Sequence, residues 1–170
     1  MSRLETGTFT LHMEETRLSD TIAQAMSTVW AKAEAKGIDL SAECDGAITV
    51  QHDPKWTAEA LYNLVDNAVK YTPAGGAVTL RAVGYELFCR VDVTDTGPGI
   101  PESEQARIFQ RFYRSPSASE AEGVGIGLYL ARQIAAGQGG YLKVSSRPGE
   151  GSTFSLFLPR AEQGESLTER

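Results

Sequence analysis

Apolar residues recur along the chain with two different periods, and the changes between them outline the predicted elements. Between residues 19 and 36 the apolar positions follow one another at helical spacing. Ser19 or Asp20 is suited to cap the start of this helix, and Gly37 favours its end. Asp53-Pro54 marks a second start, since aspartate caps and proline needs no amide at the first helical position. Helices are therefore predicted at residues 19–36, 54–71, 102–109 and 127–138.

Alternation of apolar and polar residues between these helices predicts strands. Residues 38–44 and 49–52 flank the turn signal Asp45-Gly46, which predicts a hairpin. Two further antiparallel pairs are predicted, one joined near Gly84-Tyr85 and one around Pro148-Gly149. Their strands span residues 77–83, 87–94, 141–146 and 152–158. Helices that alternate with hairpins predict an α+β fold, a two-layer α/β sandwich whose mixed sheet carries helices on one face.

The length of the chain fits one domain. With 170 residues, of which 41% are hydrophobic, it can bury one sizeable core and is short for two. We expect the domain to span residues 19–160. Residues 1–18 resemble the frayed end of an upstream helix followed by a linker, and residues 161–170 form a polar tail.

Charge and cysteine content narrow the classes of partner. Lys+Arg number 16 and Asp+Glu 22, so the net charge of -6 disfavours nucleic acid or an anionic membrane as the main partner. The chain shows neither an apolar run of membrane-spanning length nor a secretory signal, which predicts a cytoplasmic location. Cys44 and Cys89 have no metal-ligand spacing, so we expect reduced, packed thiols.

A polar stripe on the second helix is the first candidate for chemistry. Asn63, Asn67, Lys70 and Tyr71 are separated by four, three and one residues, which brings polar side chains to one helix face. An amide oxygen is a neutral ligand for Mg²⁺, and a lysine one turn later is suited to pair with phosphate. A solvated helix face is the plainer interpretation, and the stripe alone favours it.

The loop from Asp95 to Ile100 is the second candidate. A carboxylate directly after a strand can accept a hydrogen bond from an exocyclic amine, which would select adenine over guanine. Gly97 and Gly99 allow a sharp turn or a close approach of the backbone to a ligand. The alternative is an ordinary turn in which Asp95 caps its own backbone.

A glycine-rich segment before the last predicted helix is the third candidate. Gly123, Gly125 and Gly127 let amides converge on a phosphate at the helix start, and Leu128 follows them. The spacing is not that of a Walker loop, so a hinge is the ordinary interpretation. Residues 108–114 set aromatics and two arginines at the base of the polar stretch 115–122, which predicts a mobile lid.

In combination these segments resemble the N, first G, F and second G boxes of sensor histidine kinases. The last strand also resembles that family's closing strand, so the resemblance covers nearly the whole chain. The matching segments are Asn63-Leu-Val-Asp-Asn67-Ala-Val-Lys70-Tyr71-Thr72, Asp95-Thr-Gly97-Pro-Gly99-Ile100, Phe109-Gln-Arg-Phe112-Tyr-Arg114, Gly123-Val-Gly125-Ile-Gly127-Leu128 and Gly151-Ser-Thr153-Phe-Ser-Leu-Phe-Leu-Pro159. The resemblance implies the Bergerat-type ATP-binding fold of the GHKL superfamily.

The resemblance also implies a role for each matching residue, with ATP and Mg²⁺ as ligands. Asn67 binds the metal, Asn63 and Lys70 meet the phosphates, and Arg114 reaches toward the γ-phosphate, so Asn63, Lys70 and Arg114 are the catalytic set. The remaining residues bind the nucleotide: Tyr71 lines it, Asp95 receives the adenine amino group, Gly97, Gly99 and Ile100 shape that pocket, Gly123, Gly125, Gly127 and Leu128 form the phosphate side of the lid, and Thr153 supports the base side through its hydroxyl.

The identity of residue 63 also distinguishes a kinase from a hydrolytic ATPase. ATPases of the same superfamily carry a glutamate base one helical turn before the metal-binding asparagine, and here that position holds Asn63. Without a base, attack by water is slow, so the resemblance implies a protein-histidine kinase rather than a hydrolytic ATPase. A docking module that holds nucleotide without transfer is the second alternative.

The family's phosphoacceptor histidine lies in a two-helix dimerisation domain upstream of this region. His12 and His52 do not fit that role, and both are expected at the surface. Residues 1–18 then correspond to the end of the dimerisation helix and a linker, and this chain by itself is expected to be monomeric. The implied partners are the dimerisation domain, which carries the histidine, and a response regulator. The full-length protein is expected to be anchored in the bacterial inner membrane by other segments.

Overall fold

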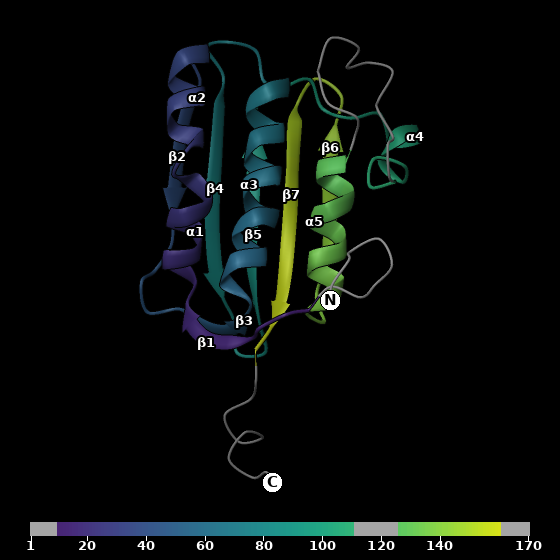
Figure 1. Ribbon diagram of the computed structural model, residues 1–170. Coiled ribbons are helices and arrows are strands. Elements are labelled where there is room, and N and C mark those ends of the chain that lie inside the picture. Colours follow the sequence, from purple (N-terminus) through teal and green to yellow (C-terminus); the bar gives the residue numbers. More distant parts are fainter. Residues whose placement is uncertain (1–9, 111–125, 161–170) are drawn as a thin grey trace, which may run out of the picture.

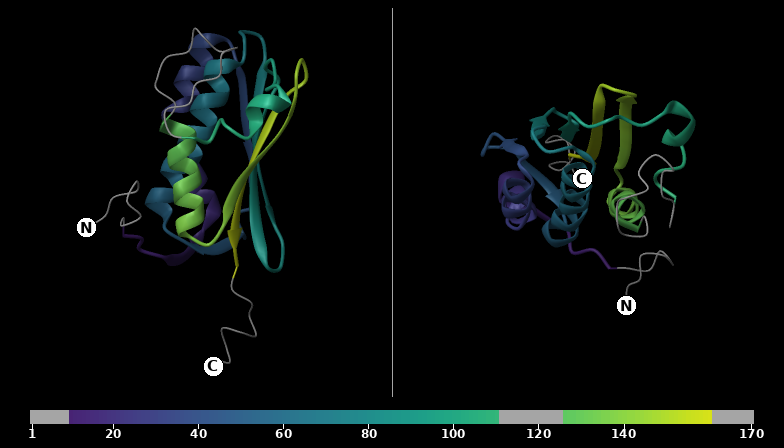
Figure 2. Two further views of the ribbon diagram at one scale, coloured as in Figure 1. Left: turned by 90° about the vertical axis from the view of Figure 1, so that its right-hand side faces the viewer. Right: turned by 90° about the horizontal axis from the view of Figure 1, so that it is seen from above.

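A computed structural model describes residues 10–110 and 126–160 of the chain. A helical layer covers one face of a sheet (Figures 1 and 2). The elements in chain order are β1 (Glu14–Arg17), α1 (Leu18–Met26), α2 (Val29–Lys36), β2 (Asp39–Glu43), β3 (Thr49–His52), α3 (Pro54–Tyr71), β4 (Ala77–Gly84), β5 (Phe88–Asp95), α4 (Glu102–Gln105), α5 (Ile126–Gly137), β6 (Tyr141–Arg147) and β7 (Gly151–Pro159). Figure 2 shows α1, α2, α3 and α5 on one side of the sheet, which confirms the predicted two-layer α+β sandwich.

The main sheet has five strands in the order β2-β4-β5-β7-β6. β2 runs parallel to β4, and the other neighbours are antiparallel, so the sheet is mixed as predicted. β5 and β7 lie side by side, with Asp95 opposite Ser152 at one end of the pair. This register brings the end of β5 together with the start of β7, and the candidate site is built around that point.

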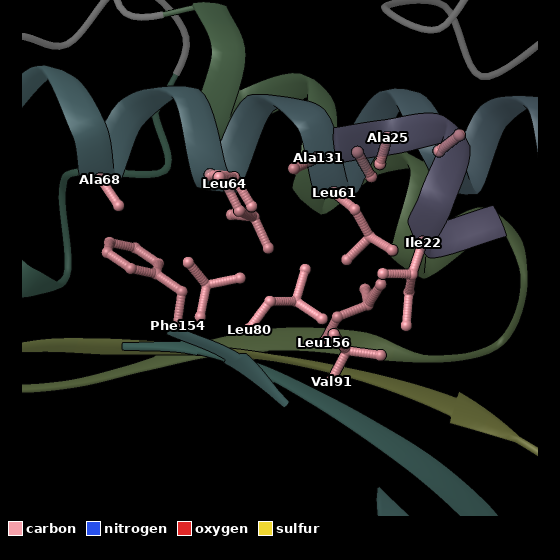
Figure 3. Packing of buried hydrophobic residues seen from close by; sticks show 14 of the residues in the cluster. Ile22, Ala25, Leu61, Leu64, Ala68, Leu80, Val91, Ala131, Phe154 and Leu156 are labelled. Atoms are coloured by element: carbon pink, nitrogen blue, oxygen red, sulfur yellow. The ribbon is translucent and has the colours of Figure 1, made fainter. Parts of the chain in front are cut away.

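The core lies between α3 and the sheet (Figure 3). Leu61 and Leu64 of α3 are fully buried and point toward Leu80 and Leu156 of the sheet. Ala131 of α5 closes the same layer from the neighbouring helix. Removing such side chains from water stabilises a fold by roughly 1.5–3 kcal/mol each. The core therefore sets the position of α3, and with it the backbone from which the polar side chains of that helix extend.

The helix predicted at residues 19–36 is divided into α1 and α2. The backbone N–H and the side-chain hydroxyl of Ser27 both bond to the carbonyl of Gln24. Serine competes in this way for helix carbonyls, and the chain turns at residues 27 and 28 before α2 begins. The end at Gly37 is confirmed, because this residue has φ of 83° and its N–H caps α2.

The predicted hairpin of residues 38–44 and 49–52 is wrong. β2 joins the main sheet beside β4, whereas β3 pairs with β1 in a separate two-stranded sheet. Asp45 and Ala47 form the predicted turn, but it connects two different sheets. The strand β1 was not predicted, and it brings residues 14–17 into the folded unit, so the expected domain start at residue 19 is too late. The alternation of apolar and polar residues in a short strand does not specify which strand it pairs with. This explains both the wrong hairpin and the failure to predict β1.

The third predicted helix is shorter than expected. Only Glu102–Gln105 is α-helical, because the next amides bond three residues back, as in Arg107 to Glu104 and Gln110 to Arg107. These tight turns allow Phe109 to contact Phe154 of β7 edge-on, with 6.0 Å between the ring centres. The predicted pairs β4 with β5 and β6 with β7 and the helix α5 are confirmed.

His52 lies in the core and not at the surface, which corrects the sequence-based expectation. Its exposed fraction is 0%, its Nδ1 donates to the carbonyl of Val50, and its Nε2 shares a 2.7 Å hydrogen bond with the hydroxyl of Thr21. His12 is exposed as expected. Cys44 and Cys89 are free thiols whose pKa values are raised by burial, in agreement with packed, reduced side chains.

Candidate functional site

The polar stripe of α3 lies on a well-defined helix. Asp53 precedes α3 with extended backbone, its carboxylate accepts the N–H of Trp56, and Pro54 occupies the first turn. The helix ends at Tyr71, since Thr72 is extended and precedes a proline. Leu61, Leu64, Val65 and Ala68 are buried as the sequence predicted, whereas Asn63, Asn67 and Tyr71 are half-buried and Lys70 is exposed.

The first turn of α5 lies directly beside Asn63. A side chain at Gly127 would begin 3.7 Å from the Cβ, Cγ and Oδ1 atoms of Asn63, which places the two residues in contact distance across the helix pair. The structure therefore brings the end of the glycine-rich segment to the polar stripe, two segments that the sequence analysis assigned to the phosphate side of one nucleotide site. Leu128 is half-buried and packs on the core from the same turn.

Asn63 has a polar atom that needs a partner. Its Nδ2 is buried, and within residues 10–110 and 126–160 no hydrogen-bond acceptor contacts it. An amide left in this way costs about 1–3 kcal/mol. Buried polar groups in native proteins are nearly always paired, so an exception of this kind is typical of a position that binds something else.

Asp95 ends β5 and is buried, with 8% of its surface exposed. Burial raises the pKa of this carboxyl above its ordinary value, and hydrogen bonds from the backbone of Gly97 and Ser152 oppose the rise. The bond from the N–H of Gly97 to Oδ1 measures 2.8 Å and is the turn contact that the plainer interpretation predicted. That contact accounts for one oxygen atom, and it does not explain why a carboxylate is buried at a strand end.

Gly97 lies against the end of α3. A side chain there would begin 3.1 Å from the carbonyl of Tyr71 and 3.3 Å from the hydroxyl of Thr72. Thr72 is fully buried, and its hydroxyl likewise lacks a hydrogen-bond partner in the part of the chain that the structure describes. Thr72 ends the first matching segment of the sequence analysis but was given no role there, because a threonine at a helix end carries no signal of its own.

The rest of the loop is fixed to the turn between β6 and β7. Gly99 has φ of 80°, and a side chain there would clash with the carbonyl of Arg147, so only glycine fits. Ile100 donates its N–H to the hydroxyl of Ser146 at 2.7 Å, and Gly149 donates its own to the carbonyl of Pro98 at 2.6 Å. The loop is therefore preorganised by contacts with residues about fifty positions away along the chain.

The strand alternation of β7 separates Thr153 from Asp95. Thr153 pairs with Thr94 through a 3.0 Å contact between hydroxyls, on the sheet face that the helices do not cover. Ser152, opposite Asp95, is buried on the helix-covered face, and its hydroxyl bonds to that of Ser146. The structure thus does not bring Thr153 to the site. Because Phe154, Leu156 and Leu158 alternate with it, the strand period alone contained the signal that selects Ser152.

Several predicted residues lie elsewhere or outside the described part. The Nζ of Lys70 lies 3.5 Å from Oδ2 of Asp66, and the Lys70 side chain is 43% exposed. Arg114, Gly123, Gly125 and the predicted lid lie outside the described residues. Among residues 10–110 and 126–160, no three His, Cys, Asp or Glu side chains gather as a metal site, so a metal here would depend on an amide oxygen such as that of Asn67. The described helices include none that is long and apolar enough to cross a membrane.

Comparisons with known proteins identify similar domains. The family described as "Histidine kinase-, DNA gyrase B-, and HSP90-like ATPase" matches residues 52–162. The sensor protein DivL of Caulobacter vibrioides is 37% identical over 164 residues, which is 96% of this chain and 21% of that protein. This chain therefore spans about a fifth of that relative.

Solved structures share the fold. The mycobacterial sensor histidine kinase MprB has a TM-score of 0.77 at 27% identity, covering 87% of this chain and 97% of the other. Full-length ShkA in complex with AMPPNP has a TM-score of 0.82 at 29% identity, covering 94% of this chain and 34% of the other.

Proposed function

This chain belongs to the family of histidine kinase-, DNA gyrase B- and HSP90-like ATPases and is a catalytic ATPase domain of the histidine kinase type, and on that premise we propose that it binds Mg-ATP and donates the γ-phosphoryl group to a histidine on a separate dimerisation domain. Residues 1–13 would connect it to that domain. A response regulator would then take the phosphoryl group, and the reactions would occur in the cytoplasm.

One observation carries the proposal: a buried carboxylate, and two buried polar atoms that have no partner among the described residues, lie along α3 and the loop that follows β5. Asp95 is a buried carboxylate, the hydroxyl of Thr72 lies close to Gly97, and the amide of Asn63 faces the first turn of α5. A nucleotide has hydrogen-bond donors and acceptors at its base and a charge at its phosphates. Its binding would satisfy groups that the described part of the protein leaves unpaired.

The base and the phosphates would occupy opposite ends of the site. Asp95 would accept from the adenine amino group, with Ser152 behind it and with Gly97, Gly99, Ile100 and Tyr71 around the ring. Asn63 and Lys70 would meet the phosphates from α3, with Gly127 and Leu128 at the start of α5. Arg114, Gly123 and Gly125 would complete the phosphate side. These groups position the nucleotide and neutralise charge, which is most of what phosphoryl transfer requires from a protein.

The donor set also fits Mg²⁺ as a ligand shared with the nucleotide. Asn67 is half-buried on the same helix face as Asn63 and offers one neutral oxygen. Mg²⁺ commonly keeps several waters and takes its remaining ligands from one or two side chains and from phosphate oxygens. When bound, it neutralises the charge that develops on the transferred group.

Asn63 favours transfer over hydrolysis. A general base must lie within hydrogen-bond reach of the water that it activates, and an amide cannot take up that proton. Asn63 occupies the helix position one turn before Asn67 and opposite Gly127. A domain that binds ATP without a base holds it intact until another nucleophile arrives. The alternatives, a docking module without transfer and a hydrolytic ATPase, differ in measurable product.

Calorimetric titration with AMPPNP, with and without Mg²⁺, tests the proposal directly. We expect saturable binding that strengthens with Mg²⁺ and that GTP does not displace. Asp95→Asn should weaken binding about 10- to 100-fold, because a hydrogen bond to a charged group contributes about 1.5–3 kcal/mol. Glu59→Gln, an exposed acid on α3, serves as the matched control and should bind normally.

The outcomes separate the three functions. No nucleotide binding, or equal binding of GTP and ATP with no effect of Asp95→Asn, would overturn the adenine pocket. Steady release of phosphate from ATP by this chain alone would favour the hydrolytic ATPase. Adding an isolated dimerisation domain from a sensor kinase then tests transfer, and binding without any phosphorylated histidine would leave the docking module as the explanation.

A further inference from the structure

Asp66 of α3 stands between two lysines that belong to different helices. Its Oδ1 atom lies 3.1 Å from the Nζ of Lys32 in α2, and its Oδ2 atom lies 3.5 Å from the Nζ of Lys70 in α3. Each carboxylate oxygen therefore faces its own ammonium group. Lys70 is the residue that we assign to the phosphates, so its resting partner bears on nucleotide binding.

The two lysines are held differently. Lys32 also donates to the hydroxyl of Tyr62 at 2.6 Å, and its ammonium lies 5.1 Å from the centre of that ring. The hydrogen bond to Tyr62 raises the pKa of Lys32 most, and the hydrogen bond to Asp66 raises it further. The contact of Lys70 is longer and joins residues four apart on one helix, a type of ion pair that stabilises a helix only weakly. Lys70 is therefore the partner that leaves more easily.

Helix geometry allows Lys70 to reach either side of α3. Residues turn by about 100° per position, so Lys70 lies about 60° from Asn67 and about 40° from Asp66 around the helix axis. Asn63, one turn before Asn67, faces α5, whereas Asp66 faces α2. A rotamer change is enough to carry the ammonium from one side to the other.

The backbone beneath Lys70 is fixed. Lys36 of α2 donates to the carbonyl of Val69 at 2.8 Å and to that of Lys70 at 2.6 Å, which closes the end of α3. These hydrogen bonds stabilise the last turn of α3, from which the Lys70 side chain extends. The helix does not need to unwind for the ammonium to change partners.

We propose that Asp66 is a positioning residue that holds Lys70 on the α2 side of the helix until the phosphates of a nucleotide take it, and that Lys32 stays behind to neutralise the carboxylate. The proposal rests on the function proposed above, in which Lys70 binds phosphate. Lys32 lowers the free-energy cost of the exchange, because Asp66 keeps a positively charged partner when Lys70 leaves it. Without Lys32, the carboxylate would compete fully with the phosphates for Lys70.

Opposite shifts in affinity test the exchange. Asp66→Asn frees Lys70 and should tighten binding of Mg-AMPPNP about two- to three-fold. Lys32→Met leaves Asp66 with Lys70 alone and should weaken binding by a similar factor, and Lys32→Arg should restore it. Both shifts should vanish in the Lys70→Met background. Binding of adenosine, which has no phosphate, should not change in any of these variants.

The Lys70→Met background distinguishes the proposed exchange of partners by Lys70 from a long-range electrostatic effect of the substitutions. If Asp66→Asn and Lys32→Met keep their effects when Lys70 is already Met, long-range charge explains them and the exchange is refuted. If Lys70→Met itself does not weaken binding, the phosphate role of Lys70 fails first. Absence of AMPPNP binding by the unmodified chain would refute the proposed function instead. Glu59→Gln removes an exposed charge elsewhere on α3 and should leave the affinity unchanged.

Discussion

The two ends of α3 treat their polar groups in opposite ways. At the start, the two oxygens of Asp53 accept the N–H groups of Trp56 and His12 at 3.0 and 2.7 Å. Gln138, at the end of α5, accepts the N–H of Asp53 at 2.7 Å and donates to the hydroxyl of Thr57 at 2.9 Å. This buried network ties together the N-terminal approach, α3 and α5. It is complete without any ligand.

From the middle of α3 onward, in the half that we call its binding end, buried polar groups remain without partners among the described residues. The amide of Asn63 and the hydroxyl of Thr72 are the two such side-chain atoms, and the nearby carboxylate of Asp95 has a pKa raised by burial. Paired polar groups stabilise a fold, whereas buried unpaired groups destabilise it. A ligand that supplies the missing hydrogen bonds removes this destabilisation. One helix thus carries a structural end and a binding end, and the difference between them can be tested.

The largest effect is expected at the structural end. Asp53→Ala removes the acceptor of two backbone N–H groups and should lower the free energy of unfolding by about 2–3 kcal/mol. Nucleotide affinity of the folded variant should stay unchanged. Chemical denaturation and calorimetry measure the two quantities. Asp45→Ala, which removes a single exposed turn contact, is the matched control and should cost only about 0.5 kcal/mol. Equal losses in both variants would contradict the importance of the network.

Asn63→Ala should show the reverse pattern at the binding end. It removes a buried amide that lacks a partner within the described residues, so stability should be unchanged or slightly higher. Affinity for AMPPNP should fall about 10-fold, equivalent to about 1.4 kcal/mol. Thr57→Val, at a paired position of the same helix, should instead cost about 1–3 kcal/mol of stability and leave affinity intact. A large loss of stability in Asn63→Ala would remove the contrast between the two ends.

Neighbouring residues of β7 should differ in the same manner but to a smaller extent. Ser152 faces the helix layer beside Asp95, and Thr153 faces the opposite side of the sheet. We expect Ser152→Ala to weaken AMPPNP binding about two- to five-fold and Thr153→Val to change it less than about two-fold, as for single neutral hydrogen bonds. Equilibrium titration of the two variants checks this. A larger effect at Thr153 would restore the assignment that the sequence favoured.

The smallest effect concerns how Asp95 links stability to pH. Because its pKa is raised in the folded protein, the folded state binds more protons than the unfolded chain between the two pKa values. Stability contributed by this residue is therefore lost as the pH rises above about 4, the ordinary value of the carboxyl. Asp95→Asn should be more stable than the unmodified protein at pH 7, and the difference should shrink toward pH 4. Thermal unfolding across this range would contradict the burial effect if the difference grew on acidification.

The sequence determined the elements whose signals are local. The cap at Asp53, the end at Gly37 and the long strands β4, β5 and β7 follow from side-chain chemistry within a few residues. The ordered motifs also led to the family. Short-range rules were sufficient because each of these features depends on neighbours in the chain.

The tertiary structure decided the pairing and the burial that no local pattern encodes. β2 and β3 alternate like a hairpin, yet each pairs with a distant strand, since hydrogen bonds of a ladder are the same for any partner. Burial of His52 depends on Thr21, thirty-one residues away. The unpaired groups of Asn63 and Thr72 likewise appear only when packing has excluded water from them, because an unmet hydrogen bond is a property of the surroundings and not of the residue.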